Sequence, residues 1–333
     1  MFHGKAWRAD RFGPIKDVLR LADRTWDSPT EGRVLISVEV CGIGYLDAMM
    51  IEGWYPMLTE PPACPGHEVA GKVVAVPPGS RFSVGDRVVG FTPFLEALGG
   101  LGEYAYTWEM MTRCVPSTLN DEQAGGLLLS AKTAHNALVD RLTMRSGEAL
   151  LVLGAAGGSG SAAVVLGKAL GATVIAAAST EEKLAFCRSI GADHTVNYRT
   201  ADLTEEVRGL TGGRGADVVF DPVGGEMANR ALRAVAREGR FAVVGLASGT
   251  FVTADAAAMV MGNYSMVGVL GGAFLDSPHR DSVAVDAVCD LAERGLISTP
   301  LGTVSSFDAA PDAIQSIADG KAIGKSVVRV RER

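Results

Sequence analysis

The sequence holds no run of about 18 apolar residues without glycine or charge, and its first residues form no apolar segment followed by small residues. We therefore expect neither a membrane-spanning helix nor a secretion signal. Basic residues are not in excess, because 31 Lys and Arg stand against 38 Asp and Glu, a net charge of −7. Without a basic run, binding to nucleic acid or to an anionic membrane is not expected, and small molecules are the expected partners.

Cysteine is scarce, and its number and spacing do not fit a disulfide framework. The five cysteines are odd in number and widely scattered: Cys41, Cys64, Cys114, Cys187 and Cys289. This usage predicts a reducing, cytoplasmic location.

The composition is that of a folded globular protein. Hydrophobic residues make up 47% and charged residues 21% of the 333 residues, which excludes a disordered chain, a collagen and a coiled coil. At roughly 100–200 residues per domain, the length suggests two domains. Glycine is frequent, with 41 residues, against a usual share of about 7%.

The patterning changes near residue 122. The first 120 residues alternate apolar and polar positions in short runs separated by Gly and Pro, which favours β structure. From about 122 onward, short apolar runs alternate with helical stretches, as in βαβ units. Six strands of a doubly wound parallel sheet are predicted at 149–153, 173–177, 194–197, 217–220, 240–244 and 265–269. The last 30 or so residues return to β character and are expected to rejoin the first domain.

A glycine-rich loop follows the first of these strands. Gly154–Gly160 ends directly at a helical run, and from Ala155 it follows the pattern A-x-G-x-x-G. Small residues there allow a sharp turn and a close approach of the backbone to a pyrophosphate, which the helix N-terminus attracts. We expect a dinucleotide to contact Ala156, Gly157, Gly158, Ser159 and Gly160. An ordinary flexible turn is the alternative.

The second strand of the unit carries the signal for the type of dinucleotide. An NAD site places a carboxylate at its end, but residues 176–180 contain none. A 2′-phosphate is therefore not repelled, Ser179 can donate a hydrogen bond to it, and Lys183 can supply positive charge. NADPH is favoured over NADH, although Glu181 and Glu182 oppose this choice and Lys183 is alternatively a solvated surface lysine.

These features, together with several motifs, resemble the medium-chain dehydrogenase/reductase superfamily. The similarity is to its zinc-independent quinone oxidoreductase branch, which also includes enoyl-thioester reductases. It covers nearly the whole chain, and the matching stretches are 40–47, 53–56, 65–71, 84–88, 131–134, 155–160, 191–194, 221–224 and 244–249.

The resemblance implies an α/β fold with two domains. A GroES-like β domain would comprise residues 1–121 and 276–333, and a Rossmann domain with a six-stranded, doubly wound parallel sheet would comprise 122–275. By the same resemblance the cofactor site would also include Thr133, Tyr198, Gly245, Leu246, Leu270 and Lys325. For Tyr198, a packed or surface tyrosine is the alternative.

Zinc enzymes of the superfamily bind the metal through two Cys and one His. By that resemblance only His67 is retained here, because the first thiolate position falls on Gly44 and the second on Leu129. Three ligands are required for a catalytic zinc site, so we expect no metal. A rearranged site that uses Cys41, Cys64 and His67 is the alternative.

Without a Lewis acid the substrate must itself be activated, as a quinone or a conjugated carbonyl compound is. Enoyl reductases that resemble this chain carry a proton-donating tyrosine at the position of Tyr55. Asp47 is expected to hold the loop that faces the nicotinamide, and His67 to line the catalytic site. Gly44, Trp54 and Phe94 are expected in the substrate pocket, with Leu270 as a further apolar wall residue. Stacking or core packing is the alternative for Tyr55 and the apolar residues.

Three functions, two enzymatic and one non-catalytic, remain open at this point. The first is an NADPH-dependent reductase of quinones or of α,β-unsaturated carbonyl compounds, including enoyl thioesters. The second is a zinc-dependent alcohol dehydrogenase with rearranged ligands, and the third a non-catalytic NADPH-binding protein. The strand at 265–269 is expected to form a sheet edge and to pair in a homodimer.

Overall fold

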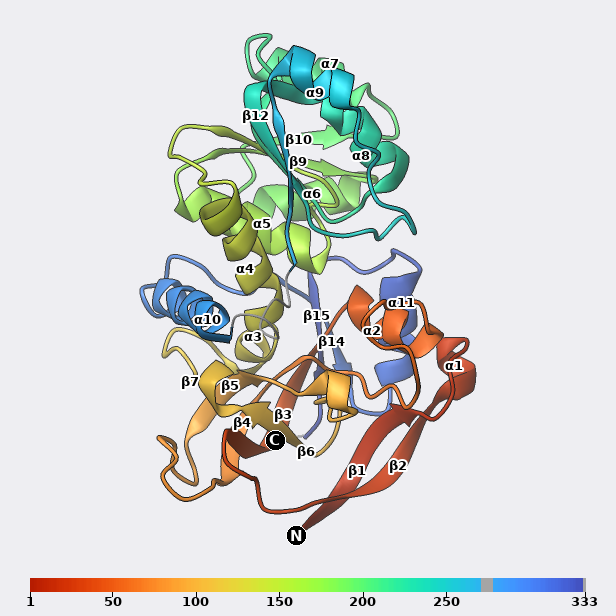
Figure 1. Ribbon diagram of the computed structural model, residues 1–333, viewed down its shortest axis with the longest axis vertical. Helices are drawn as coiled ribbons and strands as arrows, with labels where there is room; N and C mark the ends of the chain where they lie inside the picture. Colours follow the sequence, from red (N-terminus) through yellow and green to blue (C-terminus); the bar gives the residue numbers. More distant parts are fainter. Residues whose placement is uncertain (271–277, 332–333) are drawn as a thin grey trace. The chain divides into compact units, whose positions relative to one another are not determined.

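The computed structural model describes residues 1–270 and 278–331, and the chain divides into two compact units. One unit contains Met1–Leu129 with Phe274–Arg333, and the other contains Ser130–Ala273. Each unit has a β-sheet of its own (Figure 1). The domain limits 121 and 276 expected from the sequence stay a prediction.

The second unit is built on a six-stranded parallel sheet with the order β10-β9-β8-β11-β12-β13. Its strands are β8 (Ala149–Val152), β9 (Thr173–Ala178), β10 (His194–Asn197), β11 (Ala216–Asp221), β12 (Val235–Val243) and β13 (Ser265–Gly268). The order reverses beside β8, as in a doubly wound Rossmann sheet, so the predicted fold class is confirmed. All six predicted strands are present, and β12 begins earlier than expected.

Helices precede this sheet and alternate with its strands. They are α4 (Leu128–His135) with a π-helical turn at Asn136–Arg141, α5 (Gly158–Ala169), α6 (Glu181–Ser189), α7 (Leu203–Leu210), α8 (Gly225–Ala231) with a 3₁₀ turn at Leu232–Ala234, and α9 (Ala256–Gly262). A core that contains Leu151 and Phe241 takes Val207 from α7 and Ala231 from α8. On the opposite face α5 lies so close that a Cβ on Gly167 would be 2.5 Å from Leu150 Cδ2.

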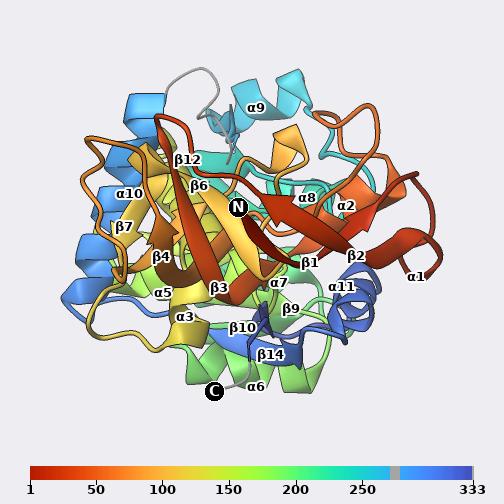
Figure 2. The ribbon, with the colours of Figure 1, turned by 90° about the horizontal axis from the view of Figure 1, so that it is seen from below.

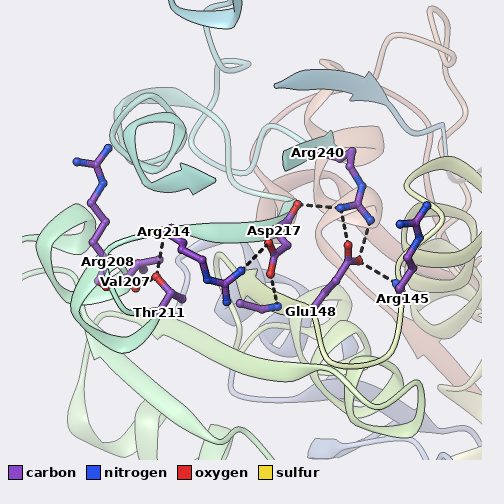
Figure 3. Close-up of polar contacts among 10 residues, drawn as sticks. Arg145, Glu148, Val207, Arg208, Thr211, Arg214, Asp217 and Arg240 are labelled. Carbon is purple, nitrogen blue, oxygen red and sulfur yellow. Dashed lines mark hydrogen bonds and ion pairs between the residues drawn. The ribbon is translucent and has the colours of Figure 1, made fainter. Parts of the chain in front are cut away.

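A polar network ties the amino ends of β8 and β11 to Arg240 of β12 (Figure 3). Arg240 forms an ion pair with Glu148 at 2.8 Å and donates to the carbonyl of Asp217 at 3.3 Å. The Asp217 carboxylate accepts from the amide of Ala149 at 2.8 Å and lies 3.5 Å from Arg214. These contacts stabilise the end of the sheet opposite to the loops that follow the strands.

The first unit is mainly β, as the sequence predicts. Its seven-stranded sheet follows the path β14-β15-β3-β4-β5-β7, with β6 paired to β3. The strands are β3 (Arg33–Ile43), β4 (Glu68–Ala75), β5 (Arg87–Phe91), β6 (Tyr104–Trp108), β7 (Thr112–Cys114), β14 (Leu301–Ser306) and β15 (Lys325–Arg329). Because β15 pairs antiparallel with β3, the C-terminal segment rejoins this unit.

A separate antiparallel hairpin, β1 (Phe2–Ala9) with β2 (Leu19–Trp26), belongs to the same unit (Figures 1 and 2). The helices of the unit are α1 (Ile15–Val18), α2 (Tyr45–Glu52), α3 (Asp121–Gly125), α10 (Pro278–Glu293) and α11 (Ala310–Ala318), with 3₁₀ turns at Phe94–Glu96 and Glu109–Met111. Ile36 of β3, Met50 of α2 and Ile314 of α11 share one buried core. Met50 is therefore a core residue. Over the described residues, none of the helices has the length and apolar character needed to cross a membrane.

Candidate functional site

The glycine-rich loop of the second unit turns sharply between β8 and α5. Gly154 has a φ of +55°, and its carbonyl accepts from the amide of Gly157 at 2.9 Å. A Cβ on Gly160 would lie 2.2 Å from that same carbonyl oxygen, so only glycine fits where α5 starts against the loop. The backbone is thus packed as a pyrophosphate-binding turn requires.

The N-terminus of α5 has free hydrogen-bond donors. Gly157 is the N-cap residue, and no side chain of the described residues caps the helix. The amides of Gly158, Ser159 and Gly160 therefore have no partner within the helix. Together with the positive end of the helix dipole they can bind the pyrophosphate of a dinucleotide. The predicted loop residues thus fit the group they are expected to hold.

The end of β9 brings two predicted cofactor residues close together. β9 ends at Ala178, Ser179 follows, and Thr180 caps α6 by accepting from the amide of Lys183. The amide of Tyr198 donates to the carbonyl of Ala178 at 3.3 Å, which places Tyr198 at the neighbouring strand end. The Glu181 carboxylate is paired with Arg188. No carboxylate belongs to residues 176–180, so a 2′-phosphate meets no acidic side chain in that stretch.

The remaining cofactor residues predicted in this unit lie at other positions. Gly245 and Leu246 follow β12, and Gly245 donates to the carbonyl of Asp221 at 3.2 Å. Thr133 is buried in α4, whereas Leu270 is exposed. The loops that follow β8, β9 and β12 thus all lie at the carboxyl ends of the strands of one parallel sheet.

The first unit contains a buried pair of Asp47 and His67. Asp47 Oδ1 lies 3.2 Å from His67 Nδ1, and both side chains are inaccessible to solvent. The carboxylate also accepts from the amides of Gly44 at 2.7 Å and Gly66 at 2.6 Å. Burial acts to raise the pKa of Asp47, but His67 and the two amides outweigh burial and lower it. Asp47 therefore holds two loops together through the Gly44 and Gly66 amides and lies against the His67 ring.

Glu68 is adjacent to His67 but has a different partner. Its Oε1 lies 2.7 Å from the ammonium of Lys325, and its Oε2 accepts from the amide of Leu129 at 2.9 Å. Lys325 also donates to the carbonyl of Ile43 at 3.1 Å and is almost fully buried. The ammonium of Lys325 is thus occupied by groups of its own unit, and its assignment to the cofactor site stays a prediction.

Tyr55 follows α2 and is half-buried. Its hydroxyl donates to Met57 Sδ at 3.3 Å, a weak acceptor, and burial raises the pKa of the phenol. The hydroxyl therefore stays protonated at neutral pH, as a proton donor must. Among the other predicted pocket residues, the indole of Trp54 donates to Glu52 and packs edge-on against Tyr45.

The last two predicted pocket residues differ in their surroundings. The Phe94 ring lies 4.1 Å from the His67 ring, centroid to centroid, and is buried. A Cβ on Gly44 would meet no atom within 4 Å, so this glycine leaves open space beside the first turn of α2.

The alternative to a metal-free site is a rearranged site of Cys41, Cys64 and His67. In residues 1–270 and 278–331, no three His, Cys, Asp or Glu side chains are grouped to hold a metal ion. The Cys41 thiol donates to the carbonyl of Gly42 at 3.6 Å, and burial raises its pKa well above the usual value. Burial also raises the pKa of Cys64. Burial thus favours the protonated thiol at both positions, whereas zinc binds the thiolate.

One residue of interest, Asp221, was not predicted as a site residue. It ends β11, is inaccessible to solvent, and burial raises its pKa to about 6. Its sequence signal is a carboxylate at the end of an apolar strand, followed by Pro222 and, after Val223, two glycines.

Comparison with known proteins adds to this geometry. Residues 30–117 match the family model described as alcohol dehydrogenase GroES-like domain, and residues 158–286 match the one described as zinc-binding dehydrogenase. A bovine protein, quinone oxidoreductase-like protein 2, is 31% identical over 98% of this chain and 94% of its own length. The 2-haloacrylate reductase of a Burkholderia species is 33% identical over 90% of this chain and 92% of its own.

A solved structure is similar to this chain over nearly its whole length. Mycobacterial Rv1454c, solved in complex with NADPH, superposes with a TM-score of 0.89 at 29% identity, covering 98% of this chain and all of that one.

Proposed function

Because the chain belongs to the medium-chain dehydrogenase/reductase superfamily and to its quinone oxidoreductase branch, we propose that it reduces a quinone or a conjugated C=C bond with NADPH and without a catalytic metal. Its activity in the broader sense is that of an NADPH oxidoreductase. The observation that carries the proposal is the dinucleotide turn Gly154–Gly160, with no carboxylate at the end of β9.

The side chains of the first unit support this class of acceptor. By family resemblance the first metal-ligand position falls on Gly44, and the nearby Asp47, His67, Glu68 and Lys325 are engaged with one another in pairs. This supports a site without a Lewis acid, which suits an acceptor that is already activated. The 2-haloacrylate reductase is named for a substrate whose C=C bond is conjugated to a carboxyl group.

When bound, NADPH supplies the hydride. The protein must orient the acceptor, stabilise the negative charge that develops on its carbonyl oxygen, and provide a proton. We assign the proton to the Tyr55 hydroxyl, which is half-buried and, among the described residues, has only a thioether as hydrogen-bond acceptor. His67, which lies against Asp47, is assigned to the catalytic site, and Gly44, Trp54 and Phe94 to the substrate pocket.

The proposal extends to the state and location of the protein. The edge strand β13, with the exposed Val260 and Met261 of α9 in the same unit, supports a homodimer. All five cysteines are free thiols, which supports a reducing compartment such as the cytoplasm.

The test is anaerobic oxidation of NADPH with 1,4-benzoquinone, trans-2-hexenal and crotonyl thioester in parallel, before and after treatment with a metal chelator. We expect turnover with at least one acceptor, unchanged by the chelator and slower with NADH. If the protein binds NADPH but oxidises it with none of the three, the reductase proposal is wrong. If the chelator abolishes turnover, the metal-independent mechanism is wrong.

A further inference from the structure

The carboxyl end of β11 carries a buried carboxylate that none of the assigned functions uses. Asp221 Oδ1 accepts from two successive amides, Val223 at 2.9 Å and Gly224 at 2.8 Å. Its Oδ2 is buried and has no hydrogen-bond partner in the described part of the chain. A buried carboxylate with one unsatisfied oxygen costs stability. Such a residue therefore calls for a reason beyond the stability of the fold.

The two bonded amides belong to a turn, Pro222–Gly225, that is joined to the loop after β12. The backbone carbonyl of Asp221 accepts from the amides of Val244 at 2.9 Å and Gly245 at 3.2 Å. The Val223 carbonyl accepts from Ser248 at 2.8 Å. Gly245 and its neighbour Leu246 are predicted cofactor residues. The carboxylate thus fixes the Pro222–Gly225 turn, to which the loop after β12 is hydrogen-bonded.

The same turn also contacts the dinucleotide loop. A Cβ on Gly154 would lie 2.8 Å from Val223 Cγ2, so this methyl group packs directly on the glycine that starts the loop. Gly224 has a φ of +70°, and a Cβ on it would lie 2.1 Å from the carbonyl oxygen of Thr250. The turn is therefore confined between the loops that follow β8 and β12.

We propose that Asp221 is a positioning residue of the cofactor site, which holds the Pro222–Gly225 turn in the shape that sets the Gly154 and Gly245 loops for NADPH. The proposal rests on the assignment of these loops to NADPH. Asp221 acts through the turn and does not itself touch the cofactor. The required property is an acceptor at Oδ1, so asparagine can substitute for it and alanine cannot.

The experiment measures NADPH binding by fluorescence titration without any acceptor, so its result does not depend on which compound is reduced. Asp221→Ala removes both hydrogen bonds to the turn, and Asp221→Asn keeps an acceptor. Val223→Ala removes the methyl group that packs on Gly154, leaves the carboxylate intact and is a mild change for folding. The matched control is Asp217→Ala, on the same strand but in the network at its amino end (Figure 3).

We expect Asp221→Ala to weaken NADPH binding about tenfold or more, since small misplacements of a binding loop are costly. The KM for NADPH should rise while the KM for the acceptor stays unchanged. Asp221→Asn should bind like the wild type, and Val223→Ala should bind less tightly than it. Asp217→Ala should bind normally even if its melting temperature falls.

Three results would overturn the proposal. The first is wild-type affinity in both Asp221→Ala and Val223→Ala. The second is an equal loss of affinity in Asp217→Ala, which would mean that general destabilisation explains the effect. The third is a failure of Asp221→Asn to restore binding, which would show that the acceptor at Oδ1 is not what matters.

Discussion

Tyr55 is the residue on which the choice between two acceptor classes depends. We predict that Tyr55→Phe lowers turnover of an enone about a hundredfold, because protonation by a positioned acid contributes roughly 10²–10⁴-fold. Turnover of 1,4-benzoquinone and the affinity for NADPH should not change. Steady-state rates with both acceptors provide the measurement. Equal rates for the variant and the wild type on the enone would mean that the tyrosine only lines the pocket.

Lys325 and Glu68 form a buried ion pair whose partners come from β15 and β4. Lys325→Met should destabilise the protein by about 3–5 kcal/mol, because it leaves the buried Glu68 carboxylate without a cation. Urea unfolding measures this loss. In the double variant Glu68→Gln/Lys325→Met, most of the stability should return, since no buried charge remains.

A matched control for this pair is Lys72, whose exposed ammonium lies 3.8 Å from Glu39. Lys72→Met should change stability by less than about 1 kcal/mol. If Lys325→Met is as stable as the wild type but binds NADPH poorly, Lys325 is a cofactor residue, as the family resemblance implies, and a purely structural role for its ammonium is wrong.

Strand β11 ends in a titrating group, which makes stability depend on pH. The pKa of Asp221 is raised from 3.8 to about 6 by burial, so between these values the folded protein binds more protons than the unfolded chain. Stability from this group therefore falls as the pH rises from about 4 to about 6. Asp221→Asn removes the effect.

We accordingly predict that Asp221→Asn is more stable than the wild type at pH 7.5, by on the order of 2–3 kcal/mol. The difference should shrink at pH 5, where the wild-type carboxyl is mostly protonated. Urea unfolding at the two pH values gives the measurement. A difference that is the same at both pH values would show that the ionisation of Asp221 is not its cause.

At the scale of the whole molecule, the exposed edge of the six-stranded sheet predicts a homodimer. Val260 and Met261 of α9 are 77% and 78% exposed, shortly before the edge strand β13. Sedimentation velocity at micromolar concentration should show a dimer for the wild type. Val260→Glu/Met261→Glu should shift it toward the monomer without loss of NADPH binding. A monomeric wild type would refute the prediction.

The parallel sheet was predictable from the sequence because each of its strands is a short apolar run bounded by turns. β12 starts at Val235 rather than near Arg240. Its early part was not predicted because Glu238 and the polar residues beside it interrupt the apolar run. The glycine loop was predictable for a similar local reason, since its small residues lie directly between an apolar strand and a helical run.

The partners of the polar groups were not predictable in the same way. His67 and Glu68 are neighbours in the sequence, yet one pairs with Asp47 and the other with Lys325. Successive residues of extended backbone point to opposite sides, so neighbours in sequence face different surroundings. Nor was it predictable that Asp221 would be buried with one oxygen that no described residue satisfies, because burial arises from elements distant in the chain.

The pairing of β15 with β3 has a consequence for how the protein folds. The second unit is formed by one continuous stretch, Ser130–Ala273, whereas the first needs segments on both sides of that stretch. Contacts between distant segments form late, because the loop between them must first be closed. During synthesis on the ribosome, the second unit can therefore fold before β15 has been made and can pair with β3. Until β15 is made, Glu68 lacks Lys325, its partner in the folded protein. The first unit is therefore the part of the nascent chain that stays incompletely folded and exposed to aggregation for longest.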